Sequence, residues 1–458
     1  MGHTTAVVLA AGLGTRMKSN LPKVLHKVCG VPMIQHVIRS LREAKADKII
    51  VVLGYRGELV EGILGSDCEV VYQHEQLGTG HALLQALPKL TDRENGDCLV
   101  VCGDTPLLTG RTLAQLRNRR RETGAFATVL TARAADPAGY GRIIKNAQGI
   151  EKIIEEKDAT EQEKRITEIN TGTYCFCLDA LKGKLALLTP ANAQGEYYLT
   201  DVVRLLAEDG KKVDSYVLKD PEEAMGVNNR IQLSEAESHM RRRIAGYHMQ
   251  EGVTIIDPGH TYIEGTVKIG RDTVIYPGVI LEGNTEIGEN CSIGPYTRIY
   301  NTHVADEVVI NQSTLLESQV GRECRIGPFS YLRPGTVLAE KVKVGDFVEV
   351  KKSFVGAGSK LPHLSYVGDS TLGKDVNIGA GTITCNYDGS AKHPTVIGDG
   401  AFVGSNTNLV APITVGAGAY IGAGSTVDGD IPPGALAIAR GRQRNIENWK
   451  SKKKGEDL

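Results

Sequence analysis

Residues 397–427 read IGDGAFVGSNTNLVAPITVGAGAYIGAGSTV, and an aliphatic residue returns in this stretch at every sixth position. The positions are Ile397, Val403, Leu409, Val415, Ile421 and Val427. Two earlier runs have the same spacing, and their members are Ile263, Ile269, Ile275, Leu281, Ile287, Ile293 and Ile299, then Val320, Ile326, Leu332, Leu338, Val344 and Val350. Helices repeat near 3.6 residues and single strands near 2, so neither element alone explains a fixed period of six.

A coil with short flat faces explains the period, because each hexad can supply one strand and one turn. Three hexads then close one turn of a triangular prism, with the aliphatic side chains stacked inside and Gly at corners that a Cβ would obstruct. This pattern is typical of a left-handed parallel β-helix, an exception to the usual right-handed crossover. The hexads lose register at 302–318 and from Gly356 to about Val396. Insertions in a solenoid map to surface loops that often carry function.

Charge and cysteine usage exclude several classes of protein. The 458 residues include 53 Lys and Arg against 54 Asp and Glu, which gives no overall field to attract nucleic acid or an anionic membrane. The nine cysteines are an odd number without a CxxC pair, which favours reduced thiols over a disulfide framework. No basic leader and no apolar run of about 18–20 residues is present. We expect a cytoplasmic protein without membrane insertion.

The first half of the chain alternates strand-like and helix-like segments. The predicted strands are 5–10, 48–53, 69–73, 98–102, 127–130 and 173–178, and the predicted helices include 33–43 and 80–87. This order predicts a Rossmann-like α/β domain with a mainly parallel sheet and a ligand site at the carboxyl ends of its strands. We expect an α/β domain at 1–227, a helical linker at 228–249, the β-helix at 250–437 and a polar tail at 438–458.

A glycine-containing turn follows the first predicted strand. The chain runs Leu9-Ala10-Ala11-Gly12-Leu13-Gly14-Thr15-Arg16-Met17 and continues to Leu21-Pro22-Lys23. Met17 stands where a dinucleotide fingerprint needs Gly, and the Gly-Lys-Ser/Thr of a P-loop is absent. What remains is a turn whose backbone N–H groups can converge on phosphate oxygens, with positive charge from Arg16 and Lys23.

This turn, with its Thr-Arg-Met and Pro-Lys sequel, resembles the nucleotidyltransferases that make nucleoside-diphosphate sugars. The resemblance implies that Leu9, Ala10, Ala11 and Gly12 contact the nucleotide and that Gln73, Gly78 and Thr79 bind the nucleobase. It further implies a stretch Cys102-Gly103-Asp104 at the reacting phosphates, sugar contacts from Gly141, Glu155 and Asn170, and a second metal ligand in Asn228. Asp104 at the end of an apolar strand suits Mg²⁺, which prefers oxygen ligands. In this family an aromatic or another small residue is expected at the position of Cys102.

The chemistry implied is attack by a sugar 1-phosphate oxygen on the α-phosphorus of UTP, with release of pyrophosphate. That nucleophile is already anionic, so no general base is needed. Catalysis then depends on orientation and on charge neutralisation by Mg²⁺, Lys23 and Arg16.

A second group of polar residues lies within the hexads, where an inert β-helix needs few reactive groups. Its members are Arg333, Glu349, Lys351, His363, Tyr366, Asn377, Asn386, Tyr387 and Lys392. Arg333 and Lys351 could bind a phosphate, and Tyr366 and Asn377 could orient a sugar. A neutral imidazole such as that of His363 suits a general base for an amine that attacks a thioester, an effect worth roughly 10²–10⁴ in rate.

Taken together, the two halves resemble the family of bifunctional bacterial uridylyltransferases and N-acetyltransferases that make UDP-N-acetylglucosamine for the cell wall. The resemblance implies acetyl transfer from acetyl-CoA to glucosamine 1-phosphate by the β-helix, with His363 as base, supported by Glu349, and with Arg333, Lys351, Tyr366 and Asn377 on the sugar phosphate. It implies an acetyl-CoA channel formed by Ala380, Asn386, Tyr387, Ser405, Ala423 and Arg440. Lys392 and Arg440 fit either contacts to CoA phosphates or plain surface charge. The resemblance also implies a homotrimer.

Two alternatives compete with this interpretation. One is a sugar nucleotidyltransferase whose β-helix only regulates or oligomerises, which the group around His363 argues against. The other is a non-catalytic scaffold that binds nucleotide sugars, which the pair of Asp104 and Asn228 argues against.

Overall fold

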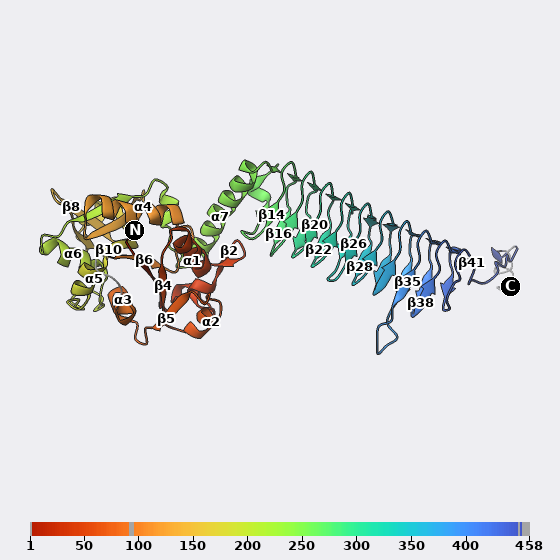
Figure 1. Ribbon diagram of the computed structural model, residues 1–458, viewed down its shortest axis with the longest axis horizontal. Coiled ribbons are helices and arrows are strands. Elements are labelled where there is room, and N and C mark those ends of the chain that lie inside the picture. The colour runs from red at the N-terminus through yellow and green to blue at the C-terminus, as the bar shows by residue number, and fades with distance from the viewer. Residues whose placement is uncertain (1, 91–95, 448, 451–458) are drawn as a thin grey trace. The chain divides into compact units, whose positions relative to one another are not determined.

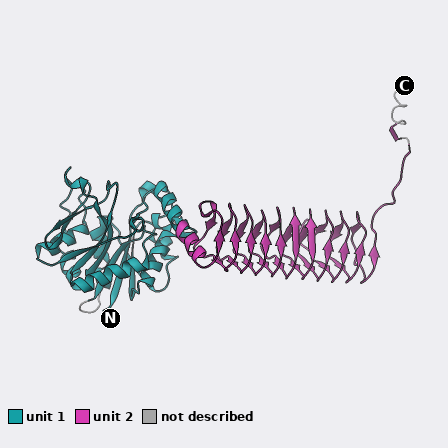
Figure 2. Ribbon diagram, turned by 90° about the horizontal axis from the view of Figure 1, so that it is seen from above, with its two compact units in different colours: residues 1–241 teal, residues 242–458 magenta. Residues whose placement is uncertain are grey.

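The chain folds into two compact units, 1–241 and 242–458, in a computed structural model that describes residues 2–90, 96–447 and 449–450 (Figure 2). The boundary between the units falls inside helix α7 (Arg230–Gln250). A helix therefore occupies the stretch where the sequence predicts a helical linker, although its last residues belong to the second unit. The expected tail lies partly outside the described residues, since 448 and 451–458 are not among them.

A mixed sheet forms the centre of the first unit (Figure 1). Its main path runs β11-β7-β10-β6-β1-β4-β5. These strands are β1 (Thr4–Ala10), β4 (Lys48–Leu53), β5 (Cys68–Tyr72), β6 (Asp97–Cys102), β7 (Ala127–Arg133), β10 (Glu168–Cys177) and β11 (Val213–Val217). All pairs are parallel except those of β10, which runs antiparallel to both β6 and β7. A short antiparallel pair, β8 (Arg142–Asn146) and β9 (Gly149–Ile154), adjoins β10.

All six predicted strands are confirmed, with ends that differ by a few residues. Both predicted helices are confirmed as α1 (Met33–Glu43) and α3 (Thr79–Ala86). The remaining helices of the unit are α2 (Gly57–Glu61), α4 (Gly110–Thr123), α5 (Leu178–Leu185) and α6 (Thr200–Glu208).

Helices cover both faces of this sheet, because alternate residues of each strand point to opposite sides. On β1, Val7 belongs to a core cluster with residues of α3, α5 and α6. Its neighbours Ala6 and Val8 belong to a second cluster with residues of α1 and α4. Two buried layers of this kind are expected where strands read as nearly continuous apolar runs. The polar residues that follow β1 and β6 are then left at one edge of the sheet.

The second unit is a parallel β-helix, so the predicted fold class is confirmed. Its strands form three sheets, in which each strand pairs in parallel with the strand one coil later (Figure 1). The stack begins at β12 (Thr254–Ile255) and ends at β41 (Leu436–Ala437). The aliphatic residues of the hexads are buried in one continuous core from Val253 to Ile431, except Ile269, which is half-buried and packs against it.

Coil length explains the two places where the hexads lose register. Lys268 contacts Glu286 across a regular coil of 18 residues. Thr302 and Ser318 are bonded across a coil of only 16 residues, so the first interruption is a deletion at the turns rather than an inserted loop. In the second interruption Lys374 meets Asp399 across 25 residues. Figure 1 shows a long loop leaving the stack just before β35 (Thr395–Ile397).

That loop is a small hairpin, which we define as residues 386–393. Tyr387 and Lys392 form an antiparallel bridge, and the His393 backbone N–H donates to the carbonyl of Asn386 at 2.8 Å. The Asp388 carboxylate accepts bonds from the backbone of Ser390 and Ala391 and lies 2.6 Å from His393 Nε2. The insertion is thus an ordered arm that carries three of the predicted site residues.

Candidate active sites

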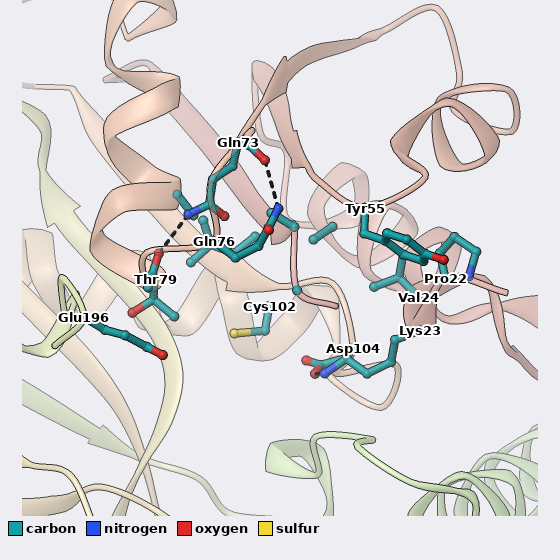
Figure 3. A pocket seen from close by; sticks show the side chains of 16 residues that line it. Pro22, Lys23, Val24, Tyr55, Gln73, Gln76, Thr79, Cys102, Asp104 and Glu196 are labelled. Atoms are coloured by element: carbon teal, nitrogen blue, oxygen red, sulfur yellow. Dashed lines mark hydrogen bonds and ion pairs between the residues drawn. The ribbon is translucent and has the colours of Figure 1, made fainter. Parts of the chain in front are cut away.

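The turn after β1 surrounds one side of a cavity of about 290 Å³ (Figure 3). Leu9, Ala10, Ala11 and Gly12 line it, together with Lys23, which opens the short 3-10 helix Lys23–Leu25. Gly14 has a φ of 63°, and a Cβ there would lie 2.8 Å from Cβ of Lys23. A Cβ on Gly12 would meet no protein atom within 4 Å. Gly14 is therefore required by packing, whereas Gly12 borders open space that a ligand can occupy.

Gln73 lies across the same cavity, at the end of β5. Its side chain is buried, and Nε2 donates to the Gly78 carbonyl at 3.2 Å and lies 3.0 Å from His81 Nδ1. These contacts leave Oε1 as the atom that can accept a hydrogen bond from a ligand, such as the N3–H of a uracil ring. Gly78 has a φ of 108°, and a Cβ there would lie 2.7 Å from the Tyr197 carbonyl, so this glycine has a structural requirement of its own.

A second cavity of about 250 Å³ adjoins the first one. It contains all three predicted sugar-binding residues, Gly141, Glu155 and Asn170. Asn170 donates to the Tyr174 hydroxyl at 2.8 Å, and the Thr200 hydroxyl donates to Glu155 at 3.2 Å. Burial raises the pKa of the Glu155 carboxyl. Sequence reasoning did not identify Thr200, which lies in α6 and carries no motif.

The two cavities share Leu9, Thr79, Cys102 and Asp104. They therefore meet where β6 ends, which places a ligand in one cavity next to a ligand in the other. Burial, followed by the Asp104 charge, raises the pKa of the Cys102 thiol to about 12, so this thiol stays protonated near neutral pH. Cys102 is consequently a neutral wall of both cavities, and the departure from the expected residue type introduces no reactive thiolate.

Three of the predicted polar residues gather around Asn228, which also lines the second cavity. Lys23 Nζ contacts both a carboxylate oxygen of Asp104 and, at 3.1 Å, the amide oxygen of Asn228. Arg16 donates to the same amide oxygen at 3.0 Å. Arg16 is exposed and lines neither of these cavities, so the structure places it at the rim of the site.

The oxygens of Asp104 and Asn228 converge, since both contact one Lys23 nitrogen. Carboxylate and amide oxygens are donors that suit Mg²⁺, which keeps water or phosphate oxygens as its other ligands. Across the described residues, no group of three or more His, Cys, Asp or Glu side chains is arranged to hold a metal ion. The donor set thus fits a cation that shares its ligands with a substrate.

In the second unit, strand register assembles the other predicted group. Asp346 ends β27 (Lys343–Asp346) and lies opposite His363, which ends β30 (Lys360–His363). The side chains meet, with His363 Nδ1 2.9 Å from Asp346 Oδ1. Glu349, which the resemblance implies as a support of His363, accepts a bond from Arg333 at 2.7 Å. Asp346 is the carboxylate that contacts the imidazole, and the sequence analysis did not identify it. Its only signal in the sequence is that it precedes His363 by 17 residues, about the length of one coil.

Cationic side chains belong to the same predicted group. Lys351 ends β28 (Glu349–Lys351), and contact with the amine of Lys392 from the hairpin lowers its pKa. Tyr366 begins β31 (Tyr366–Gly368) opposite Glu349. Two amines side by side lower the pKa of Lys351 even though the Asp369 charge acts in the opposite direction, and this indicates a place for an anion such as a phosphate. Lys392 therefore joins Lys351 here, rather than being an isolated surface charge.

The residues predicted for acetyl-CoA follow one line along the stack. Gly381 bonds to the carbonyl of Leu364, next to His363, and Asn406 bonds to that of Ala380. In the next coils Gly424 bonds to the carbonyl of Ser405, and Arg440 donates to that of Ala423 at 2.6 Å. Ala380, Ser405 and Ala423 are thus equivalent positions on successive coils, and they lead from His363 to Arg440. Small side chains along this line leave room for an extended ligand.

Other site residues surround the beginning of this line. Asn386 is buried and donates to Asp369 at 2.6 Å, and its amide also lies 3.4 Å from the Tyr366 hydroxyl. A Cβ on Gly368 would lie 2.4 Å from that hydroxyl, so this glycine makes room for it. Neither Asp369 nor Gly368 was identified from the sequence. Tyr387 is 60% exposed on the hairpin. Asn377 begins β33 (Asn377–Ile378), with Lys360 and Phe402 as its neighbours on adjacent coils.

An α/β unit with a phosphate-binding turn, followed by a hexapeptide β-helix that carries its own polar site, defines a class of two-domain sugar-nucleotide transferases. Comparisons with known proteins agree with this class. Residues 6–167 match the MobA-like NTP transferase domain, 259–360 match the GMPPB C-terminal domain, and 394–429 match six repeats of the bacterial transferase hexapeptide.

Two relatives cover nearly the full chain. The bifunctional protein GlmU of Pelotomaculum thermopropionicum is 56% identical over 458 residues, and that of Heliobacterium modesticaldum is 55% identical over 454 residues, each with 99% of both chains covered. Among solved structures, a UDP-glucose pyrophosphorylase complexed with UDP-glucose matches 53% of this chain and 99% of its own, at 19% identity and a TM-score of 0.43.

The chain belongs to the GlmU family of bifunctional proteins. It is a bifunctional enzyme with uridylyltransferase and acetyltransferase activities in the synthesis of UDP-N-acetylglucosamine. The alternatives of a single activity and of a non-catalytic scaffold do not fit this family.

Proposed function

We propose that the cavity beside Gln73 binds UTP and that the adjoining cavity beside Glu155 binds N-acetylglucosamine 1-phosphate. The observation that carries this proposal is that the two cavities meet at Asp104. A sugar phosphate in one cavity then lies next to the α-phosphorus of a nucleotide in the other, which is the arrangement that in-line transfer requires.

The phosphate oxygen attacks the α-phosphorus, a new P–O bond forms, and pyrophosphate leaves. Asp104 and Asn228 would hold Mg²⁺, which neutralises phosphate charge when bound. Lys23 and Arg16 add fixed positive charge beside this position. Gln73 selects the base through its free Oε1, and Glu155 and Asn170 orient the sugar.

Acetyl transfer takes place on the β-helix. Glucosamine 1-phosphate places its phosphate between Arg333, Lys351 and Lys392, and acetyl-CoA follows the line from Ala380 to Arg440. The amine attacks the thioester carbonyl, the C–N bond forms and the C–S bond breaks. His363 Nε2 takes the proton that the nitrogen loses and can return it to the departing thiolate.

Three further proposals follow from the family resemblance. The domain division at 227 and 250 separates the two activities. The enzyme acts in the cytoplasm, in line with nine cysteines that are all free thiols. It is a homotrimer, and exposed apolar residues at one corner of the coils support self-association, although Gln312 occupies that corner on the coil between Tyr296 and Phe329. These apolar residues are Tyr296, Phe329, Phe347 and Leu364, with exposed fractions of 74, 52, 58 and 61%.

The test is an assay that follows both products separately. The purified protein is incubated with glucosamine 1-phosphate, acetyl-CoA, UTP and Mg²⁺, and free thiol and pyrophosphate are measured. We expect both products, with pyrophosphate dependent on acetyl-CoA, and we expect EDTA to stop pyrophosphate release but not thiol release. Pyrophosphate only from ready-made N-acetylglucosamine 1-phosphate, with no thiol, would contradict the acetyl site.

A further inference from the structure

We propose that Asp346 is a positioning residue for acetyl transfer: its carboxylate accepts a hydrogen bond from Nδ1–H of His363 and so leaves Nε2 unprotonated and aimed at the substrate amine. This inference rests on the proposed role of His363 as the base. The 2.9 Å distance between Asp346 Oδ1 and His363 Nδ1 carries it. A neutral imidazole has one N–H, and the bond made by one ring nitrogen decides which nitrogen can accept a proton.

The backbone holds this pair in register. Asp346 and His363 are direct partners of β27 and β30, and the Leu364 backbone N–H donates to the Asp346 carbonyl at 2.9 Å. The backbones of the two coils lie so close here that a Cβ on Gly345 would be only 1.9 Å from the Pro362 carbonyl oxygen. The carboxylate therefore meets the ring through fixed strand geometry and not through a chance contact of two flexible side chains.

The other nearby carboxylates are engaged elsewhere. Glu349 is bonded to Arg333, and Asp369 accepts from Asn386. Asp346 stays ionised near neutral pH, because first its own backbone N–H and then His363 lower its pKa. Among the described residues, Asp346 is thus the acid that contacts His363.

The test compares variants of the full-length protein. In Asp346→Ala the ring loses its partner, so kcat for acetyl transfer should fall by about 10-fold or more, and by no more than the roughly 10²–10⁴ that a positioned base supplies. KM for glucosamine 1-phosphate should change little, since the phosphate and sugar contacts remain. In Asp346→Asn the amide can donate to Nδ1 and leave the proton on Nε2, so this variant should also lose most of kcat although it keeps the shape of the side chain. Uridylyl transfer and the melting temperature serve as internal checks of folding.

Glu286→Ala is the matched control. Glu286 also bridges coils, with Lys268 Nζ at 2.6 Å and His303 Nδ1 at 3.6 Å, but it lies outside the acetyl site. We expect wild-type acetyl transfer from this variant.

A double variant separates positioning from a general structural effect. If Asp346 acts through His363, then His363→Ala with Asp346→Ala should be no slower than His363→Ala alone. Wild-type kcat in Asp346→Ala, or losses that multiply in the double variant, would overturn the proposal. Normal acetyl transfer in His363→Ala would instead overturn the proposed function, so the two failures are distinguishable.

Discussion

At the scale of single residues, the sites depend on what surrounds their titratable groups. Glu155 is the half-buried acid of the sugar cavity, and Asp104 and His363 represent the two activities. Each of these residues makes a separable prediction.

Glu155→Gln tests whether the ionised carboxylate of this sugar-binding residue lowers the folding stability of the protein. Burial raises the pKa of Glu155 above 4.5, so ionising the carboxyl costs folding free energy. The Gln variant should be more stable than the wild type at pH 7, and the difference should disappear as the pH falls through the raised pKa toward 4.5. Urea unfolding followed by circular dichroism from pH 4 to 8 measures this difference. A constant difference at all pH values would contradict the assignment.

The same variant should bind the sugar phosphate less well. A hydrogen bond to a charged group is worth about 1.5–3 kcal/mol, so KM for N-acetylglucosamine 1-phosphate should rise about 10-fold or more while acetyl transfer stays unchanged.

Asp104→Ala and His363→Ala form a crossed pair. Asp104→Ala should abolish pyrophosphate release and leave thiol release near normal, because its cavities lie within the first unit. His363→Ala should do the reverse. Pyrophosphate and free thiol are measured separately for each variant. Equal loss of both activities in either variant would contradict two independent sites.

Sequence reasoning identified site residues where they stand in a motif and missed them where only the fold brings them together. Asp104 and Lys23 follow recognisable stretches of sequence. Asp346 reaches His363 only because β27 and β30 are paired in register, and Thr200 reaches Glu155 only because α6 packs on β9. The support of His363 by Glu349 came from the family resemblance, and the structure shows Glu349 bonded to Arg333.

At the scale of elements, the period of six was enough to predict the coil but not its length. Deleted turn residues and an added hairpin both interrupt the period, and the sequence pattern does not distinguish them. Likewise, β10 reads as another buried strand, and its antiparallel direction follows from the connection through β8 and β9. Direction within a sheet depends on such connections rather than on composition.

Close approach of two coils gives a prediction about β27. Gly345→Ala places a methyl group 1.9 Å from the Pro362 carbonyl, so the strands beside His363 must move apart. Overpacking of this kind costs about 1–3 kcal/mol, and acetyl kcat should fall together with the melting temperature. Gly429→Ala is the control, because a Cβ there would meet nothing within 4 Å. Equal behaviour of the two variants in calorimetry would show that the predicted contact is absent.

At the scale of the whole molecule, the buried clusters follow the two units. One cluster contains residues of the β-helix and the end of α7, and the other two contain residues of the α/β unit. Because the cores are separate, truncating a buried side chain in one unit should lower the thermal stability of that unit only.

Leu116→Ala and Leu281→Ala test this independence. Each side chain is fully buried, in α4 and in β16 (Ile280–Glu282) respectively, and each truncation should cost about 2–5 kcal/mol. Leu116→Ala should lower the temperature of half-inactivation for uridylyl transfer only, and Leu281→Ala should lower that for acetyl transfer only. A shared shift after brief heating and assay of both products would show that the units unfold together.

The stacked coils also have a consequence for how such a chain can change in length. The coils from Thr254 to Val320 contribute none of the residues proposed for acetyl transfer, which begin at Arg333. Duplication or loss of a complete coil in that stretch would act as a change of spacer and would keep every distance within the acetyl site. One extra residue inside β30, just before His363, would instead reverse the alternation of inward and outward side chains and separate the pair. Growth of this protein by whole repeats is therefore tolerated in its first coils and excluded from its later ones.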